Sequence, residues 1–188
     1  MNAPEERRPE LEVPLTQSVD VRKLPESGVT GVVTASAEQC EAIAQLIDLI
    51  SLQQLSFSYR LTPLERDRVH LSGRLEAQGE QKCVVSLDPV AFRLEEDVDL
   101  EFWPQEDLAR LEQAGEAEAY ELDPSGPEPL EGSHIDVGRL AYELLVSSLD
   151  PYPRKEGVSF QWEGSGEDEA EQPENPFDAL ASLRDKLK

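Results

Sequence analysis

The spacing of apolar residues changes several times along the chain. Between residues 52 and 103 the period approaches two, as in LQQLSFSYRLT, RVHLSGRLEAQ and VAFRLEEDVDLEFW. Because neighbouring side chains of a β-strand point to opposite faces, this alternation predicts strands with one apolar side each. Short strands are also predicted at 29–34 and at 82–87 (KCVVSL), with a turn at Gly79 and Glu80 before the latter. Short polar connections between consecutive strands favour an antiparallel meander.

Two segments repeat their apolar residues at helical spacing. Residues 37–50 form one predicted helix, and Ser36 followed by Gln39 resembles a capping box at its start. Residues 135–149 (IDVGRLAYELLVSSL) form the other, which the DPYP sequence after it stops. A short helix is predicted near 104–113, followed by a loop at 123–132. The expected fold class is α+β, an antiparallel β-sheet packed by two main helices, and closure of the sheet into a barrel is left open.

The ends of the chain differ in composition from its middle. We expect a disordered arm at 1–9, a single α+β domain at 10–162, an acidic disordered linker at 163–174 and an amphipathic helix at 175–188 (NPFDALASLRDKLK). Phe177, Leu180 and Leu183 lie on one stripe of this C-terminal helix. The stripe either docks on a partner or folds back on its own domain.

Charge narrows the class of partner. Forty acidic residues against seventeen basic ones give a formal net charge of −23. Binding to a polyphosphate depends on Lys and Arg, so the chain as a whole favours a basic protein over a nucleic acid. Plain solubility is the alternative explanation of this charge. The sequence has neither an apolar run long enough to cross a bilayer nor a secretory signal, and we therefore expect a cytoplasmic protein.

The candidate chemical groups do not form a known catalytic pattern. The densest acidic run, residues 95–101, is predicted to place Asp97, Asp99 and Glu101 on one solvated face of a strand. Neither His70 nor His134 stands in a nucleophile or metal motif. The two cysteines, at positions 40 and 83, are expected to be reduced. We therefore expect no catalytic, cofactor-binding or metal-binding residues, and no enzymatic activity.

A rigid, partly cationic segment follows the second main helix. In PYPRK, at residues 151–155, Tyr152 and Arg154 could anchor a partner. The alternative is that Tyr152 is buried at the helix stop. Gly73, alone within a predicted strand, is expected to mark a bulge or the close approach of another backbone, and not a ligand site.

Three separated segments resemble one family. The tail ENPFDALASLRDK resembles the C-terminal signature of the YceD-like bacterial and plastid proteins, which are named for accumulation of large-subunit ribosomal RNA. The segment IDVGRLAYELLVSSLDPYPR is similar to the family's helix with a proline-containing stop. KCVVSLDPV falls where many members have a C-x-x-C pair. Because Cys83 has its partner position occupied by Ser86, a shared metal or redox role does not carry over to this chain.

The resemblance implies a role in the production or stability of large-subunit ribosomal RNA, and so in ribosome biogenesis. Together with the acidic composition, it suggests a non-enzymatic factor that contacts a basic ribosomal protein or an rRNA-processing factor, with an indirect effect on pre-rRNA. One alternative is direct pre-rRNA binding through Arg60, Arg66, Arg68 and Arg154, which requires these cations to converge on one face. The other is an acidic chaperone for a basic client protein.

Overall fold

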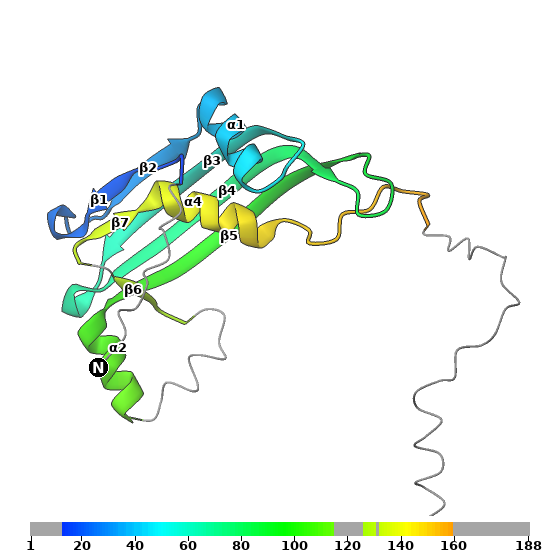
Figure 1. Ribbon diagram of the computed structural model, residues 1–188. Helices are drawn as coiled ribbons and strands as arrows, with labels where there is room; N and C mark the ends of the chain where they lie inside the picture. Colours follow the sequence, from blue (N-terminus) through cyan, green and yellow to red (C-terminus); the bar gives the residue numbers. More distant parts are fainter. Residues whose placement is uncertain (1–12, 115–125, 131, 160–188) are drawn as a thin grey trace, which may run out of the picture. The chain divides into compact units, whose positions relative to one another are not determined.

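The computed structural model describes residues 13–114, 126–130 and 132–159. The described residues up to Gly157 form one compact unit, and a second unit, Val158–Lys188, is described only at its first two residues. The strands are β1 Ser18–Asp20, β2 Val29–Thr34, β3 Ser51–Pro63, β4 Val69–Lys82, β5 Pro89–Pro104, β6 Glu128–Leu130 and β7 His134–Asp136. The helices are α1 Ala37–Leu46, α2 Gln105–Ala114 and α4 Val137–Ser148, with 3-10 turns at Val21–Lys23 and Glu65–Asp67 (Figure 1). The first unit therefore has the predicted α+β class.

Five strands form the main sheet, in the order β2-β3-β4-β5-β6. The first four are antiparallel to their neighbours, whereas β6 runs parallel to β5. The prediction of a purely antiparallel sheet is therefore wrong at this edge, because the connection that contains α2 returns the chain in the direction of β5. β1 and β7 pair separately as a small antiparallel sheet. Within the described residues β2 and β6 are not paired with each other, so these strands do not close a barrel.

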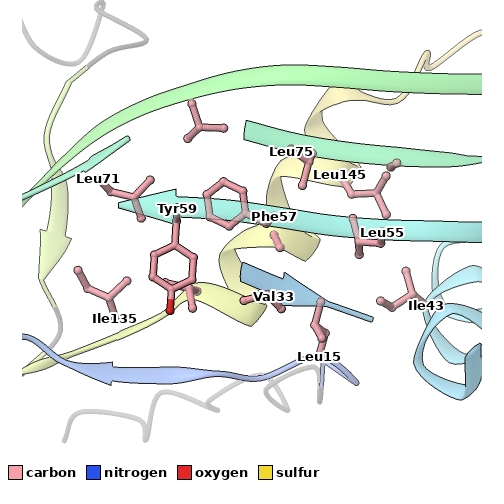
Figure 2. Close-up of a cluster of buried hydrophobic side chains, with 14 of the residues drawn as sticks. Leu15, Val33, Ile43, Leu55, Phe57, Tyr59, Leu71, Leu75, Ile135 and Leu145 are labelled. Carbon is pink, nitrogen blue, oxygen red and sulfur yellow. The ribbon is translucent and has the colours of Figure 1, made fainter. Parts of the chain in front are cut away.

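The hydrophobic core lies on one face of the main sheet. Apolar side chains from β3 and β4 point toward this face, where α1, α4 and the β1–β7 pair contribute the opposing side chains (Figure 2). Fully buried members of the core include Phe57, Leu55, Leu61, Leu71, Leu75, Ile43 and Leu145. The other face carries mainly hydroxyl and charged side chains, as the two-residue period predicts.

The two main helices begin close to where the sequence predicts. Ser36 and Gln39 form the predicted capping box of α1. α1 ends at Leu46, earlier than expected, because the chain turns through a left-handed residue, Asp48 (φ 54°), into β3. At the start of α4 the carboxylate of Asp136 accepts hydrogen bonds from the first turn of the helix.

The prediction around residues 79–87 is wrong in two respects. β4 continues through Gly79 to Lys82, and the chain then turns where a strand was expected. A side chain at Gly79 would meet the ring of Phe92 on β5, so this glycine marks a close approach instead of a turn. Gly73 marks the predicted close approach of another backbone, because a Cβ there would lie 2.5 Å from the carbonyl oxygen of Ser58, and 2.8 Å from the ring of Phe57. The predicted loop at 123–132 contains β6, whose Leu130 is buried in the core.

Candidate functional site

The turn between β4 and β5 is organised by one buried sulfur. The Sγ atom of Cys83 accepts hydrogen bonds from the backbone N–H groups of Val85, Ser86 and Lys155, each with an N–S distance of 3.4 Å. The N–H of Cys83 donates to the carbonyl oxygen of Asp88 at 2.8 Å. Lys155 lies after α4, far along the chain, and its ammonium group is 3.0 Å from the carboxylate of Asp88. Cys83 therefore joins the β4–β5 turn to the segment that follows α4.

These hydrogen bonds favour the charged form of the sulfur. The hydroxyl of Ser86 makes the largest contribution, and with the three backbone N–H groups it lowers the pKa of Cys83 to about 6. Ser86 stands at the second position of the C-x-x-C pattern, so a hydrogen-bonding residue occupies that place. The sulfur is fully buried, which prevents contact with an outside substrate. The described residues contain no cluster of three or more potential metal ligands. The geometry therefore fits a structural thiolate.

Tyr152 and Arg154, both proposed from sequence as partner-binding residues, are exposed. The Tyr152 residue is 71% exposed, so the alternative with a buried tyrosine is wrong. Pro153 is the buried residue of this segment, and its carbonyl oxygen accepts the N–H of Val84 at 2.9 Å. The guanidinium of Arg154 has no hydrogen bond or ion pair to any described residue. The helix stop therefore presents an aromatic ring and a cation to solvent.

The β4–β5 turn also exposes apolar side chains. Leu87 is 68% exposed and has a φ of 63°, a left-handed conformation that is unfavourable for a branched side chain. Its N–H donates to the carbonyl oxygen of Cys83 at 3.0 Å, which helps to hold that conformation. Val84, next to the sulfur, is exposed as well. With Tyr152, these residues give two joined segments an apolar surface that the core does not use.

The predicted solvated acidic face of β5 is confirmed for Asp97 and Asp99, whereas the third predicted member, Glu101, is half-buried and accepts a hydrogen bond from Trp103 Nε1 at 2.8 Å. The side chains of Asp97 and Asp99 are 81% and 79% exposed. Arg74 on β4 is shared between two carboxylates, at 2.6 Å from Glu95 and 2.8 Å from Asp97. His70 Nε2 lies 3.2 Å from Asp99. Because β5 supplies more carboxylates than β4 supplies cations, this face can attract a positively charged group.

A groove of about 690 Å³ lies on the core face of the sheet, between α4 and the strands β5, β6 and β7. Its apolar lining comes from the sheet and from the helix: Leu100, Phe102, Leu130, Leu140 and Leu144. Arg139 and Glu143, which form an ion pair at 2.9 Å, lie along its helical wall. The groove therefore has an apolar interior with charged groups at its margin.

The four arginines suggested for direct RNA binding do not converge. The guanidinium of Arg68 bonds to the buried carboxylate of Asp107 at 2.9 Å and lies 3.5 Å from the centre of the Trp103 ring. Arg66 and Arg68 precede β4, whereas Arg154 lies beside the turn that follows it. The fourteen residues of β4 separate these positions by roughly 45 Å at about 3.3 Å per residue. Arg60 donates to the carbonyl oxygen of Ser27 at 2.7 Å.

His134 lies beside a serine and an aspartate, which are the residue types of a hydrolase triad. Its Nδ1 atom is 3.2 Å from the hydroxyl of Ser133, but its Nε2 atom is 4.0 Å from the carboxylate of Asp20. That carboxylate instead binds Arg22 and Lys23, which hold its pKa far below the usual range. No hydrogen bond joins the imidazole to the carboxylate, so this arrangement does not supply an activated hydroxyl.

The remaining partner-binding residues from the sequence, Phe177, Leu180 and Leu183, lie outside the described residues. Sequence reasoning missed two features of the described part. One is Asp107, a buried carboxylate between Arg68 and Arg110. The other is the second edge of β5, which β6 pairs only at its end. A signal for that edge was present in the sequence as Glu96, a charge at a position where the alternation calls for an apolar residue.

Comparisons with known proteins bear on the whole of this region. The profile of the family described as "Large ribosomal RNA subunit accumulation protein YceD" matches residues 71–184, more than half of the chain. The chain belongs to the YceD family. The YceD match includes the Cys83 turn, β5, α4 and the tail. No curated protein and no solved structure was found to match the chain. The name of the YceD family ties it to accumulation of large-subunit ribosomal RNA.

None of the described helices combines the length and apolarity needed to cross a bilayer.

Proposed function

We propose that this YceD-family protein is a non-enzymatic factor of ribosome biogenesis that supports accumulation or processing of large-subunit ribosomal RNA through contacts with a basic protein. The partner is a basic ribosomal protein or an rRNA-processing factor, and the effect on pre-rRNA is indirect. The description of the family, which names accumulation of large-subunit ribosomal RNA, supports the process that we propose. The acidic face of β5 is the single observation that supports the mode of action.

Electrostatics favours a protein partner of opposite charge. The chain carries a formal net charge of −23, and Asp97 and Asp99 extend into solvent on an open sheet face. Such a field accelerates the approach of a cationic surface and opposes that of a phosphate backbone. Exposed Tyr152 and Leu87 could add apolar contact area of the kind that anchors interfaces. The same features would also suit the alternative function, an acidic chaperone for a basic client protein. That alternative differs from our proposal in having no role in ribosome biogenesis.

Direct binding of pre-rRNA is less well supported. Arg68 is engaged with Asp107 and Trp103, and Arg154 lies at the opposite end of β4. A nucleic-acid surface instead needs several cations close enough to neutralise adjacent phosphates. We therefore place ribosomal RNA downstream of the protein contact.

A complementation experiment tests the proposal. In a strain that lacks the gene, the ratio of large-subunit to small-subunit ribosomal RNA should fall, and the wild-type chain should restore it. Asp97→Lys with Asp99→Lys should fail to restore the ratio and should lose basic proteins that the wild type captures after nuclease treatment. Glu26→Lys with Glu41→Lys, two exposed carboxylates away from β5, makes the same change in net charge and should behave as wild type.

Two results would contradict the proposal. One is that the Asp97→Lys, Asp99→Lys variant fully restores the ribosomal RNA ratio and captures the same proteins as the wild type. The other is tight binding or cleavage of a naked large-subunit transcript by the purified chain at physiological ionic strength, because that would make the RNA contact direct.

A further inference from the structure

β5 is paired on only one side over most of its length. Residues from Pro89 to Phe102 pair with β4, but on the other side β6 pairs only with residues from Phe102 to Pro104. Within the described part of the chain, the stretch from Pro89 to Glu101 therefore presents an unpaired backbone edge of roughly 40 Å. Unpaired N–H and C=O groups along a strand are a template for one more strand. β6 already uses one end of this edge in that way.

The two faces beside this edge have different chemistry. Exposed Asp97 and Asp99 lie on the outer face, together with Glu95. On the opposite face, half-buried Leu94 and Leu100 point toward the core side of the sheet, and Leu100 lines the groove beside α4. A strand added here would place alternate side chains against carboxylates and against an apolar groove. The matching sequence alternates cationic with apolar residues.

Glu96 adds a condition on the partner. It lies opposite Leu75 in the β4–β5 register and so belongs to the apolar face of β5. Its side chain is exposed, and no described residue forms a hydrogen bond or ion pair with it. A charge at an inward position protects an edge, because an apolar strand pairing there would bury an uncompensated carboxylate. A Lys or Arg at the facing position removes that cost, so Glu96 discriminates in favour of cationic strands.

We propose that the β5 edge between Pro89 and Glu101 binds an extended, lysine- or arginine-rich segment of a partner protein as an added β-strand. The apolar residues of that segment fill the groove between β5 and α4, and its cations meet Glu95, Asp97 and Asp99 on one face and Glu96 on the other. This inference rests on the proposed function and specifies the surface and the form of the basic partner.

Hydrogen exchange on the full chain tests the site with defined peptides. The probes are an eleven-residue peptide of alternating Lys and Val whose central Val is replaced by Lys to face Glu96 (the Lys/Val peptide), a scrambled peptide of the same composition, and an alternating Ser and Val peptide of the same length. An extended strand of eleven residues spans about 35 Å. In the free protein, the β5 amides that do not donate to β4 should exchange rapidly. The Lys/Val peptide should slow their exchange, and the other two peptides should not.

Variants separate the contributions of the two faces. Asp97→Lys with Asp99→Lys should weaken binding of the Lys/Val peptide on the order of tenfold, since two attractive cross-strand pairs become repulsive. Glu26→Lys with Glu41→Lys should leave binding unchanged. Glu96→Val should allow the Ser/Val peptide to bind, because the inward charge is gone. Glu96→Gln, which keeps the size of the side chain, checks that charge and not shape is responsible.

Several outcomes would overturn the inference. Slow exchange of the edge amides in the free protein would mean that the chain already covers its own edge. Equal binding of the scrambled peptide would reduce the effect to general charge attraction, and protection confined to another element would place the site elsewhere. Protection of these amides by a ribosomal RNA transcript would assign the surface to RNA. If no peptide protects the β5 edge while Asp97→Lys with Asp99→Lys still fails to restore the ribosomal RNA ratio, the proposed function stands and only the strand-binding site is refuted.

Discussion

Replacement of Gly138 by alanine tests the junction where the N-terminal segment crosses the start of α4. Gly138 is buried in the first turn of the helix. A Cβ atom there would lie 2.7 Å from the backbone nitrogen of Gln17 and 2.8 Å from two backbone atoms of Thr16. These atoms belong to the main chain, so the N-terminal segment would have to move by roughly 0.7 Å to reach ordinary van der Waals contact.

Two effects of opposite sign decide the result. The N–H of Gln17 donates to Asp136 at 2.8 Å, its carbonyl accepts from Val137 at 2.9 Å, and both hydrogen bonds would lengthen. Their loss costs about 1 kcal/mol each, and poorer packing of neighbouring buried Leu15 adds about 1 kcal/mol. Alanine is better than glycine inside a helix by about 1 kcal/mol. The net expectation is a loss of about 2 kcal/mol in the free energy of unfolding.

Urea and thermal denaturation followed by circular dichroism measure this loss. A decrease of about 2 kcal/mol corresponds to a melting temperature lower by about 4–8 °C for a unit of this size. Ser147→Ala, at an exposed position of the same helix, is the matched control and should gain a few tenths of a kcal/mol. If Gly138→Ala proves as stable as wild type or more so, helix propensity outweighs the clash and the reasoning about this junction fails.

Three further substitutions probe the elements around the candidate site. Leu87→Gly should raise the free energy of unfolding by about 0.5 kcal/mol in urea denaturation, because it removes left-handed strain from an exposed side chain; a decrease would show that the leucine is packed. Asp107→Leu should lower the free energy of unfolding by about 3 kcal/mol, because removal of this carboxylate, which is only 9% exposed, leaves the guanidinium of Arg68 without its ion pair. The double variant Asp107→Leu with Arg68→Leu should recover part of that loss, and a double variant with no recovery would refute the pairing argument. Cys83→Ala should be less stable than wild type by an amount that depends on pH. The pKa of the Cys83 thiol is about 6 in the folded chain, below its value of about 8.5 in an unfolded chain. The stabilisation from the thiolate is therefore complete above about pH 8.5 and is lost as the pH falls through about 6. Urea titrations across this range measure the deficit, and a deficit independent of pH would argue against a thiolate.

Local pattern predicted the elements whose partners lie nearby in sequence. The strands of the meander pair with their neighbours along the chain, and the capping box of α1 involves only Ser36 and Gln39. The KCVVSL segment misled because its β-branched residues favour a strand. Its conformation is set instead by hydrogen bonds to Pro153 and Lys155, about seventy residues later, which no local window contains. The parallel strand β6 was missed for a related reason, since its short proline-containing sequence is typical of a loop.

Glu96 shows how register changes the meaning of a residue. In the sequence it is one of several consecutive acids, and a run of like charge is typical of a solvated face. The pairing with β4 divides that run: Asp97 and Glu95 face outward with Arg74, while Glu96 lies opposite buried Leu75 on the apolar face. A carboxylate there contributes nothing to the core, yet it keeps a long exposed edge from pairing with apolar strands. If the edge binds a strand as proposed, the same charge favours a strand with a Lys or Arg at the facing position, which is the form of basic partner that we propose.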